Sequence, residues 1–164
     1  MPFGNPSGLG LIGVLLSIVV AMVLCIMPTP PAWFIYNPDW LALILIYWTL
    51  IAPDRVSVFT AWVVGLTADV LTGRLLGQHA LAYAIMGYLN IRMRQHLLLL
   101  PPIFQCVWVF LILALTQLLV LWTQRIELAP SMRIIYWLPS ASGALAWPIL
   151  VWVMQGLGRV FRGL

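Results

Sequence analysis

The sequence predicts an all-α integral membrane protein with six transmembrane helices in one bundle. Of its 164 residues, 63% are hydrophobic and only 7% are charged, and the mean hydropathy is +1.05. A soluble domain carries about 25% charged residues, so this chain could not cover a water-facing surface. Its apolar residues form runs of membrane-spanning length. The length allows one polytopic membrane domain, 1–164, and no separate soluble domain.

The first predicted span, 9–27, stops at a proline cluster that begins with Pro28. About 20 apolar residues are needed to cross a hydrocarbon core of about 30 Å, and this run meets that length. We expect it to be retained as a helix, because it is too long for a signal peptide and no Lys or Arg precedes it. Trp33, Phe34 and Tyr36 then form a pattern typical of an interfacial aromatic belt.

The second predicted span, 39–53, is short, because about fourteen helical residues rise only about 21 Å. Such a helix must thin the bilayer, stand upright or be shielded by its neighbours. Asp39, at its start, is expected to cap free backbone amides.

Four further spans complete the predicted bundle: 56–72, 78–91, 97–123 and 134–155. Residues 73–77 form a corner, "RMRQH" ends the fourth span, and His96 is expected in a solvated loop. Arginine counting favours cytoplasmic termini, with five arginines inside and three outside. The inner set is Arg55, Arg92, Arg94, Arg159 and Arg162, and the outer set is Arg74, Arg125 and Arg133.

The charges and motifs exclude several classes of function. The net charge is +4, but no basic run or stripe indicates nucleic-acid binding. The chain has no nucleotide-binding loop and no GxSxG, HExxH or CxxC pattern. We therefore expect no cofactor. Cys25 and Cys106 lie inside apolar runs and are expected to be small buried hydrophobic residues.

Catalysis and metal binding are not expected either. His79 and His96 are predicted on opposite sides of the membrane, so they would not share a metal ion. Only Asp39, Asp69 and Glu127 could meet at the outer face, which is a thin set for acid–base or metal chemistry. We expect a protein that is not an enzyme.

Gly65, Asp69, Gly73 and Gly77 fall at intervals of four, which places helical residues on one face. Small residues at this spacing let another helix approach closely, so these positions are candidates for partner binding or helix packing. Gly73 and Gly77 could instead end the helix and free the backbone to turn.

Asp69 lies about 20 Å along its helix, where an ionisable group is costly and normally faces the protein interior or a cavity. Its nearest candidate partner is Arg74, with Arg125 or Arg133 as alternatives. It could instead bind exposed amides at the start of the next helix.

The last span carries "SASGALAWP", where Ser142 and Gly143 belong to a second small-residue surface that packs internally or against a partner helix. Pro148 is expected to kink this helix, or to be tolerated without functional meaning.

Residues 27–89 resemble the MreD family of rod shape-determining proteins. The match rests on these positions: Pro38, Trp40, Tyr47-Trp48, Pro53-Asp54-Arg55-Val56, Gly65, Asp69, Gly73 and Gly77, with Trp147-Pro148 later. The resemblance implies a bacterial inner-membrane protein of the cell-elongation machinery, without a catalytic motif. Its implied partners are the single-span protein MreC, MreB filaments, RodA and the elongation transpeptidase.

The resemblance also implies a fold similar to the substrate-binding subunit of energy-coupling-factor transporters, with a pocket open to the periplasm. Candidate pocket or loop anchors are Pro38, Trp40, Tyr47, Trp48 and Arg74.

We therefore expect a subunit that binds MreC and helps control peptidoglycan synthesis. The outer loops around 28–38 and 124–133 would orient the first periplasmic segment of MreC. The alternative is a small-molecule or lipid binding or transport subunit with an outward-facing pocket near Asp69.

Overall fold

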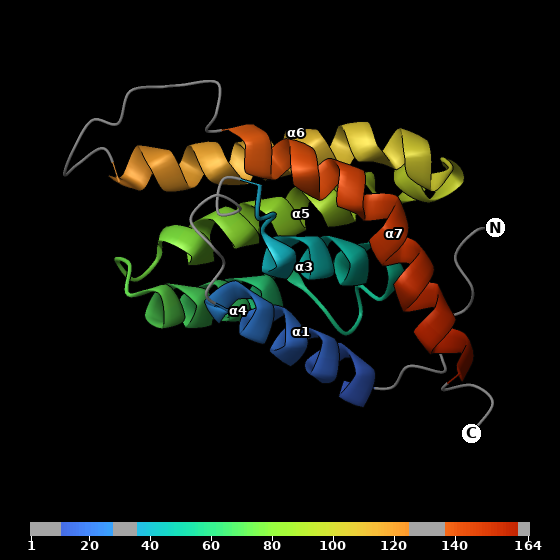
Figure 1. Cartoon of the computed structure of the whole chain (residues 1–164), viewed down its shortest axis with the longest axis horizontal. Coiled ribbons are helices and arrows are strands. Elements are labelled where there is room, and N and C mark those ends of the chain that lie inside the picture. Colours follow the sequence, from blue (N-terminus) through green and yellow to red (C-terminus); the bar gives the residue numbers. More distant parts are fainter. Residues whose placement is uncertain (1–10, 28–35, 125–136, 161–164) are drawn as a thin grey trace.

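A computed structural model describes residues 11–27, 36–124 and 137–160 of the chain, and over these residues the protein contains helices and no strand. The helices are α1 (Leu11–Ile26), α3 (Trp40–Ile51), α4 (Val58–Thr72), α5 (Gln78–Leu99), α6 (Pro102–Gln124) and α7 (Leu138–Val160) (Figure 1). The predicted all-helical class with six helices is confirmed. Most of the two outer loops, with Trp33, Phe34, Arg125, Glu127 and Arg133, lies outside the described residues.

Two segments, Ile103–Trp122 of α6 and Leu138–Leu157 of α7, are long and apolar enough to cross a membrane. The apolar helices α1, α3 and α4 are shorter, at 16, 12 and 15 residues. Six membrane crossings and a cytoplasmic position for both termini remain predictions.

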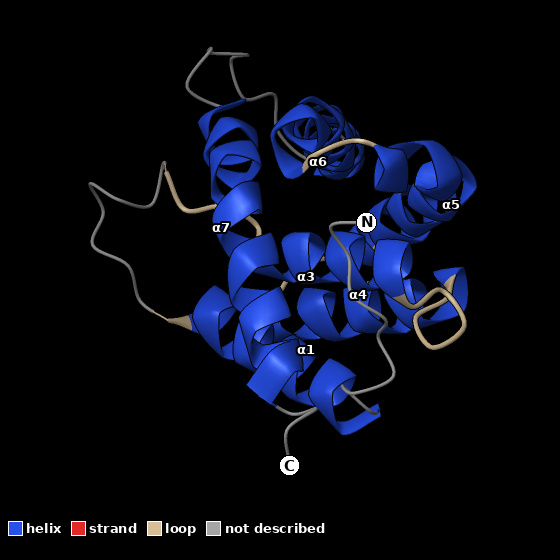
Figure 2. Cartoon of the chain, turned by 90° about the vertical axis from the view of Figure 1, so that its right-hand side faces the viewer, coloured by secondary structure: helices blue, strands red, loops and turns tan. Residues whose placement is uncertain are grey.

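The short helix α3 runs through the middle of the bundle (Figure 2). It contacts α1, α5, α6 and α7, and every residue from Leu41 to Ile51 is buried. Twelve residues rise only about 18 Å. Of the three arrangements open to such a helix, the structure favours shielding by its neighbours. The predicted cap is confirmed, because the Asp39 carboxylate accepts a hydrogen bond from the Ala42 amide at 3.0 Å.

Buried polar side chains fix α3 against its neighbours. Asn90 of α5 donates to the Ile46 carbonyl at 2.9 Å and to the Thr49 hydroxyl at 2.6 Å, and it accepts from the Trp108 indole at 3.0 Å. At the far end of α3, the Arg94 guanidinium donates to the Leu50 carbonyl at 2.6 Å. These hydrogen bonds satisfy polar side chains and backbone carbonyls that would be costly to bury without a partner.

Helix α5 is longer than predicted and continues through "RMRQH" to Leu99. His96 therefore lies in its last turn, so the expected loop was wrong, although the side chain is exposed as expected. No glycine or proline interrupts this stretch, and Arg, Met and Gln favour helices. The helix ends only where Leu100, at φ −89° and ψ 142°, adopts the extended backbone that a following proline favours.

Helices α1 and α7 both pack against the central helix α3. Helix α7 continues past Pro148 and bends along its course, as expected for a helix with an internal proline (Figure 1). Cys25 on α1 is exposed rather than buried as predicted, because α1 packs on α3 through another face that carries Val14, Ile18 and Ala21.

Candidate functional site

Several predicted site residues lie at one end of the bundle, where α3, α5 and α7 begin and α4 and α6 end; Tyr47, Trp48 and Gly65 lie farther along α3 and α4. A sealed corner around Asp69 and a polar cavity beside Asp39 lie at this end, and an apolar groove lies between α1 and α7. The corner is made by residues 69–80, whereas the cavity and the groove each combine residues far apart in the sequence.

Asp69 joins α4 to the start of α5. Its side chain is fully buried, and its carboxylate accepts hydrogen bonds from the amides of Gly77 at 2.8 Å, His79 at 2.9 Å and Ala80 at 3.4 Å. The His79 ring lies 2.7 Å away through Nδ1. Because Gly77 at the N-cap has no side chain, Asp69 supplies the missing cap of α5.

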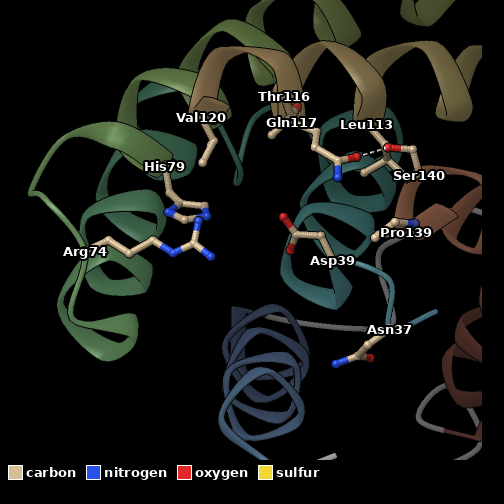
Figure 3. Close-up of a pocket in the computed structure, with 10 residues that line it drawn as sticks. All are labelled: Asn37, Asp39, Arg74, His79, Leu113, Thr116, Gln117, Val120, Pro139 and Ser140. Atoms are coloured by element: carbon tan, nitrogen blue, oxygen red, sulfur yellow. Dashed lines mark hydrogen bonds between the residues drawn. The ribbon is translucent and has the colours of Figure 1, made fainter. Parts of the chain in front are cut away.

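The expected ion pair between Asp69 and Arg74 does not form in the described residues, where the His79 imidazole lies against the Asp69 carboxylate instead. Only the Arg74 amide bonds to residue 69, by donating to its carbonyl at 3.1 Å. The Arg74 side chain instead lies beside the cavity (Figure 3). The structure thus favours the role of Asp69 as a polar anchor that binds amides of the next helix.

The three corner glycines have different roles. Gly73 ends α4 at φ 63° and Gly77 precedes α5 at φ 105°, backbone conformations that favour glycine. A Cβ on Gly65 would lie 2.5 Å from the Ala80 Cα, so α4 and α5 touch there. Gly65 is therefore a packing residue inside the chain, and the other two are turn residues.

The small residues of α7 also pack internally. A Cβ on Gly143 would lie 2.6 Å from Leu113 of α6 and 3.6 Å from Pro38. The Ser142 hydroxyl donates to the Pro139 carbonyl of its own helix at 2.9 Å. Gly143 therefore packs α7 against α6, whereas the Ser142 hydroxyl is bonded within α7.

The aromatic candidates divide into core and surface. Tyr47 and Trp48 are buried and stack edge to face, with ring centroids 5.4 Å apart. The Trp48 indole donates to the Ser17 hydroxyl of α1 at 2.8 Å. Trp40 is half-buried, donates to Asn37 at 3.0 Å, and borders the apolar groove. The packing assigns Tyr47 and Trp48 to the core.

A polar cavity of about 160 Å³ opens between the ends of α3 to α7 (Figure 3). Asp39, Arg74 and His79 line it, together with Gln117 of α6 and Ser140 of α7. The Ser140 hydroxyl donates to Gln117 at 2.6 Å.

The Asp39 carboxylate accepts from the Tyr83 hydroxyl at 2.7 and 2.9 Å, so the acid keeps a fixed orientation beside the cavity. Sequence reasoning assigned Asp39 as a cap and as one of three acids at the outer face, and did not include His79, Gln117 or Ser140 in a pocket. No spacing could have grouped them, because they come from separate helices.

An apolar groove of about 450 Å³ lies between α1 and α7, with α3 as its floor. Gly13, Ser17 and Ala21 line its α1 wall at intervals of four, and Ala146 lines the α7 wall. Sequence reasoning missed this site, although the four-residue spacing on α1 was a visible signal.

No group of three or more His, Cys, Asp or Glu residues suited to a metal ion occurs in the described segments. The two acids of the site, Asp39 and Asp69, are held by capping and inter-helix hydrogen bonds. The arrangement therefore offers two places where a ligand or partner could bind, the polar cavity and the apolar groove.

Comparison with known proteins agrees with the family resemblance. The family model described as rod shape-determining protein MreD matches residues 8–157. The rod shape-determining protein MreD of Haemophilus influenzae is 31% identical over 144 residues, which cover 86% of this chain and 87% of that protein. No solved structure matches the chain. The expected similarity to the energy-coupling-factor transporter subunit therefore stays a prediction.

Proposed function

The chain belongs to the MreD family of rod shape-determining proteins, and from this membership we propose that it is a non-enzymatic subunit of the bacterial cell-elongation complex. Family membership supports a role in rod-shape determination. Within that role, we propose that the protein crosses the inner membrane several times, with both termini in the cytoplasm, and binds the single membrane helix of MreC. MreB, RodA and the elongation transpeptidase would join through the same complex.

The observation that carries this proposal is the apolar groove between α1 and α7. Its walls include Leu16, Val20, Ile149 and Val153, which are 56%, 51%, 67% and 44% exposed. Exposed apolar residues of a membrane protein contact lipid or another helix. The small residues Gly13, Ser17 and Ala21 on the α1 wall allow a helix to approach closely, which favours helix association in lipid.

The faces first expected to bind a partner are less suitable. Gly65 lies against the backbone of α5, and Gly143 lies against Leu113, so neither is free to receive another helix. Gly73 is a turn residue. The groove is therefore our choice for the MreC helix.

In this mechanism the bundle holds the MreC helix at a fixed angle and leaves its periplasmic segment at the end where α3, α5 and α7 begin. The outer loops around 28–38 and 124–133 would then orient that segment. The protein would thus control how MreC is presented to the peptidoglycan synthase. No bond is made or broken in this mechanism.

Cysteine crosslinking in membranes tests the docking site. In a background with Cys25→Ala and Cys106→Ala, Val20→Cys or Val153→Cys should crosslink to single cysteines along a co-expressed MreC helix. Phe59→Cys and Val70→Cys are matched controls, because both residues are 66–70% exposed but lie on α4, outside the groove. Equal crosslinking from α4 would contradict the assignment.

A bulky side chain that fills the groove should also weaken the complex with MreC. Ala146→Phe places a ring in the groove, whereas the adjacent Leu145→Phe adds the same ring at a position that is 77% exposed and does not line it. We expect co-purification with MreC to fall only for Ala146→Phe. An unchanged yield with correctly inserted Ala146→Phe protein would rule out this groove.

A further inference from the structure

The polar cavity brings two opposite charges together without pairing them. Asp39 and Arg74 both line it, but no ion pair joins them in the part of the chain that the structure describes. The Asp39 carboxylate is held by the Ala42 amide and the Tyr83 hydroxyl, which are both uncharged. By contrast, Asp69 has His79 beside it.

Charged groups near the hydrocarbon region of a membrane are normally paired or face a water-filled cavity, and they often mark ligand sites. Here a negative group and a positive group face the same recess from separate walls (Figure 3). A ligand that carries both charges would match both walls at once, whereas a singly charged ligand would leave one wall unmatched.

The volume of the cavity sets the size of the group that it can take up. A protein cavity of about 150 Å³ holds benzene, which has six heavy atoms, and the cavity here is about 160 Å³. A molecule of six to eight heavy atoms fits this volume at roughly the same density. Peptides, lipid headgroups with their glycerol, and sugar nucleotides are too large to be enclosed.

The rest of the lining suits a small amphipathic molecule. Leu113, Val120 and Pro139 present apolar surface, while Asn37, Thr116 and Ser140 present polar groups. An aliphatic side chain of one or two carbons would contact the apolar part while the charged groups face Asp39 and Arg74.

We propose that this cavity is a binding site for a small zwitterion of amino-acid size, with its ammonium group at Asp39 and its carboxylate at Arg74. His79 lines the same cavity, and its ring is held in place by Asp69. Since the groove and the cavity share no lining residue, this site does not depend on the docking of a partner helix.

The test is equilibrium binding of radiolabelled alanine to the full chain in lipid nanodiscs, with glycine, serine and both alanine enantiomers as competitors. Saturable binding in the micromolar to millimolar range is expected for so small a ligand. Acetate and ethylamine, which carry one charge each, should compete at least about 10-fold less well, because each makes only one of the two charge-assisted bonds.

Two variants locate the site. Arg74→Gln and Asp39→Asn should each weaken alanine binding by at least about 10-fold. Both should remain folded, because Arg74 is exposed and makes no side-chain bond among the described residues, and Asn caps helices as well as Asp does. Arg92→Gln removes an exposed arginine from the opposite half of α5 and should bind alanine normally.

Absence of saturable binding by any of the four zwitterions would overturn the proposal, and so would undiminished binding in both folded variants. Either result would leave the crosslinks between the groove and MreC unaffected. Conversely, loss of those crosslinks with normal alanine binding would contradict the proposed function and retain the ligand site.

Discussion

The two acids at one end of the bundle, Asp69 and Asp39, perform the same structural task in different surroundings. Each caps the start of a helix: Asp39 caps its own helix α3, and Asp69 caps α5 from the end of α4. Asp69 is fully buried with His79 against it, whereas Asp39 is half-buried beside a cavity and has only uncharged partners.

The difference teaches how to interpret a lone acid in a membrane protein. Asp69 attracted attention in the sequence because it stands alone in an apolar stretch, yet its carboxylate is occupied by backbone amides and an imidazole. Asp39 was expected mainly to cap its helix, yet its carboxylate has no cationic neighbour within ion-pair distance among the described residues. The bonding partners of each carboxylate, rather than its isolation in the sequence, distinguish the structural acid Asp69 from the ligand-site candidate Asp39.

The largest loss of stability is expected when the hydrogen bonds of the sealed corner are removed. Asp69→Ala would leave the amides of Gly77 and His79 and the His79 ring without their acceptor. Each buried donor left unsatisfied costs about 1–3 kcal/mol, so we expect the combined loss to exceed about 3 kcal/mol. The free energy of unfolding in mixed micelles titrated with SDS measures this loss. Asp54→Ala, in an exposed turn, is the control and should leave stability unchanged. If Asp69→Ala lowered the free energy of unfolding no more than Asp54→Ala does, Asp69 would not be what holds the corner.

A smaller effect is expected where the same corner is packed most tightly. Gly65→Ala places a Cβ 2.5 Å from the Ala80 Cα, so α4 and α5 must move apart, at a cost of about 1–3 kcal/mol. Gly156→Ala, where a Cβ meets nothing within 4 Å, should keep or raise stability by up to about 1 kcal/mol. The same SDS titration compares them, and equal stability of the two variants would contradict this close contact.

The smallest effect is expected at Asp39. Asp39→Ala removes a helix cap and should cost about 1 kcal/mol, because water in the cavity can replace part of the lost bonding. Asp39→Asn keeps a capping oxygen and should change stability by less than about 0.5 kcal/mol. If Asp39→Ala destabilised the protein as much as Asp69→Ala, the distinction between a sealed acid and an open one would be lost.

Composition and local chemistry were enough to predict the helical class, six helices, the cap at Asp39 and the turn roles open to Gly73 and Gly77. These properties depend on hydrophobic run length and on backbone preferences that act over a few residues. The family was also recognisable, because its motifs lie within one continuous stretch, 27–89, that the family model includes.

The partner of Asp69, the internal position of Gly65 and both recesses required the packed helices. His79 and Arg74 are both within ten residues of Asp69 in sequence, and only the direction of the turn after Gly73 places the histidine against the acid. The polar cavity and the apolar groove each combine side chains from helices that are distant along the chain. A recess depends on the relative placement of whole helices, and hydrophobic periodicity along one helix does not encode that placement.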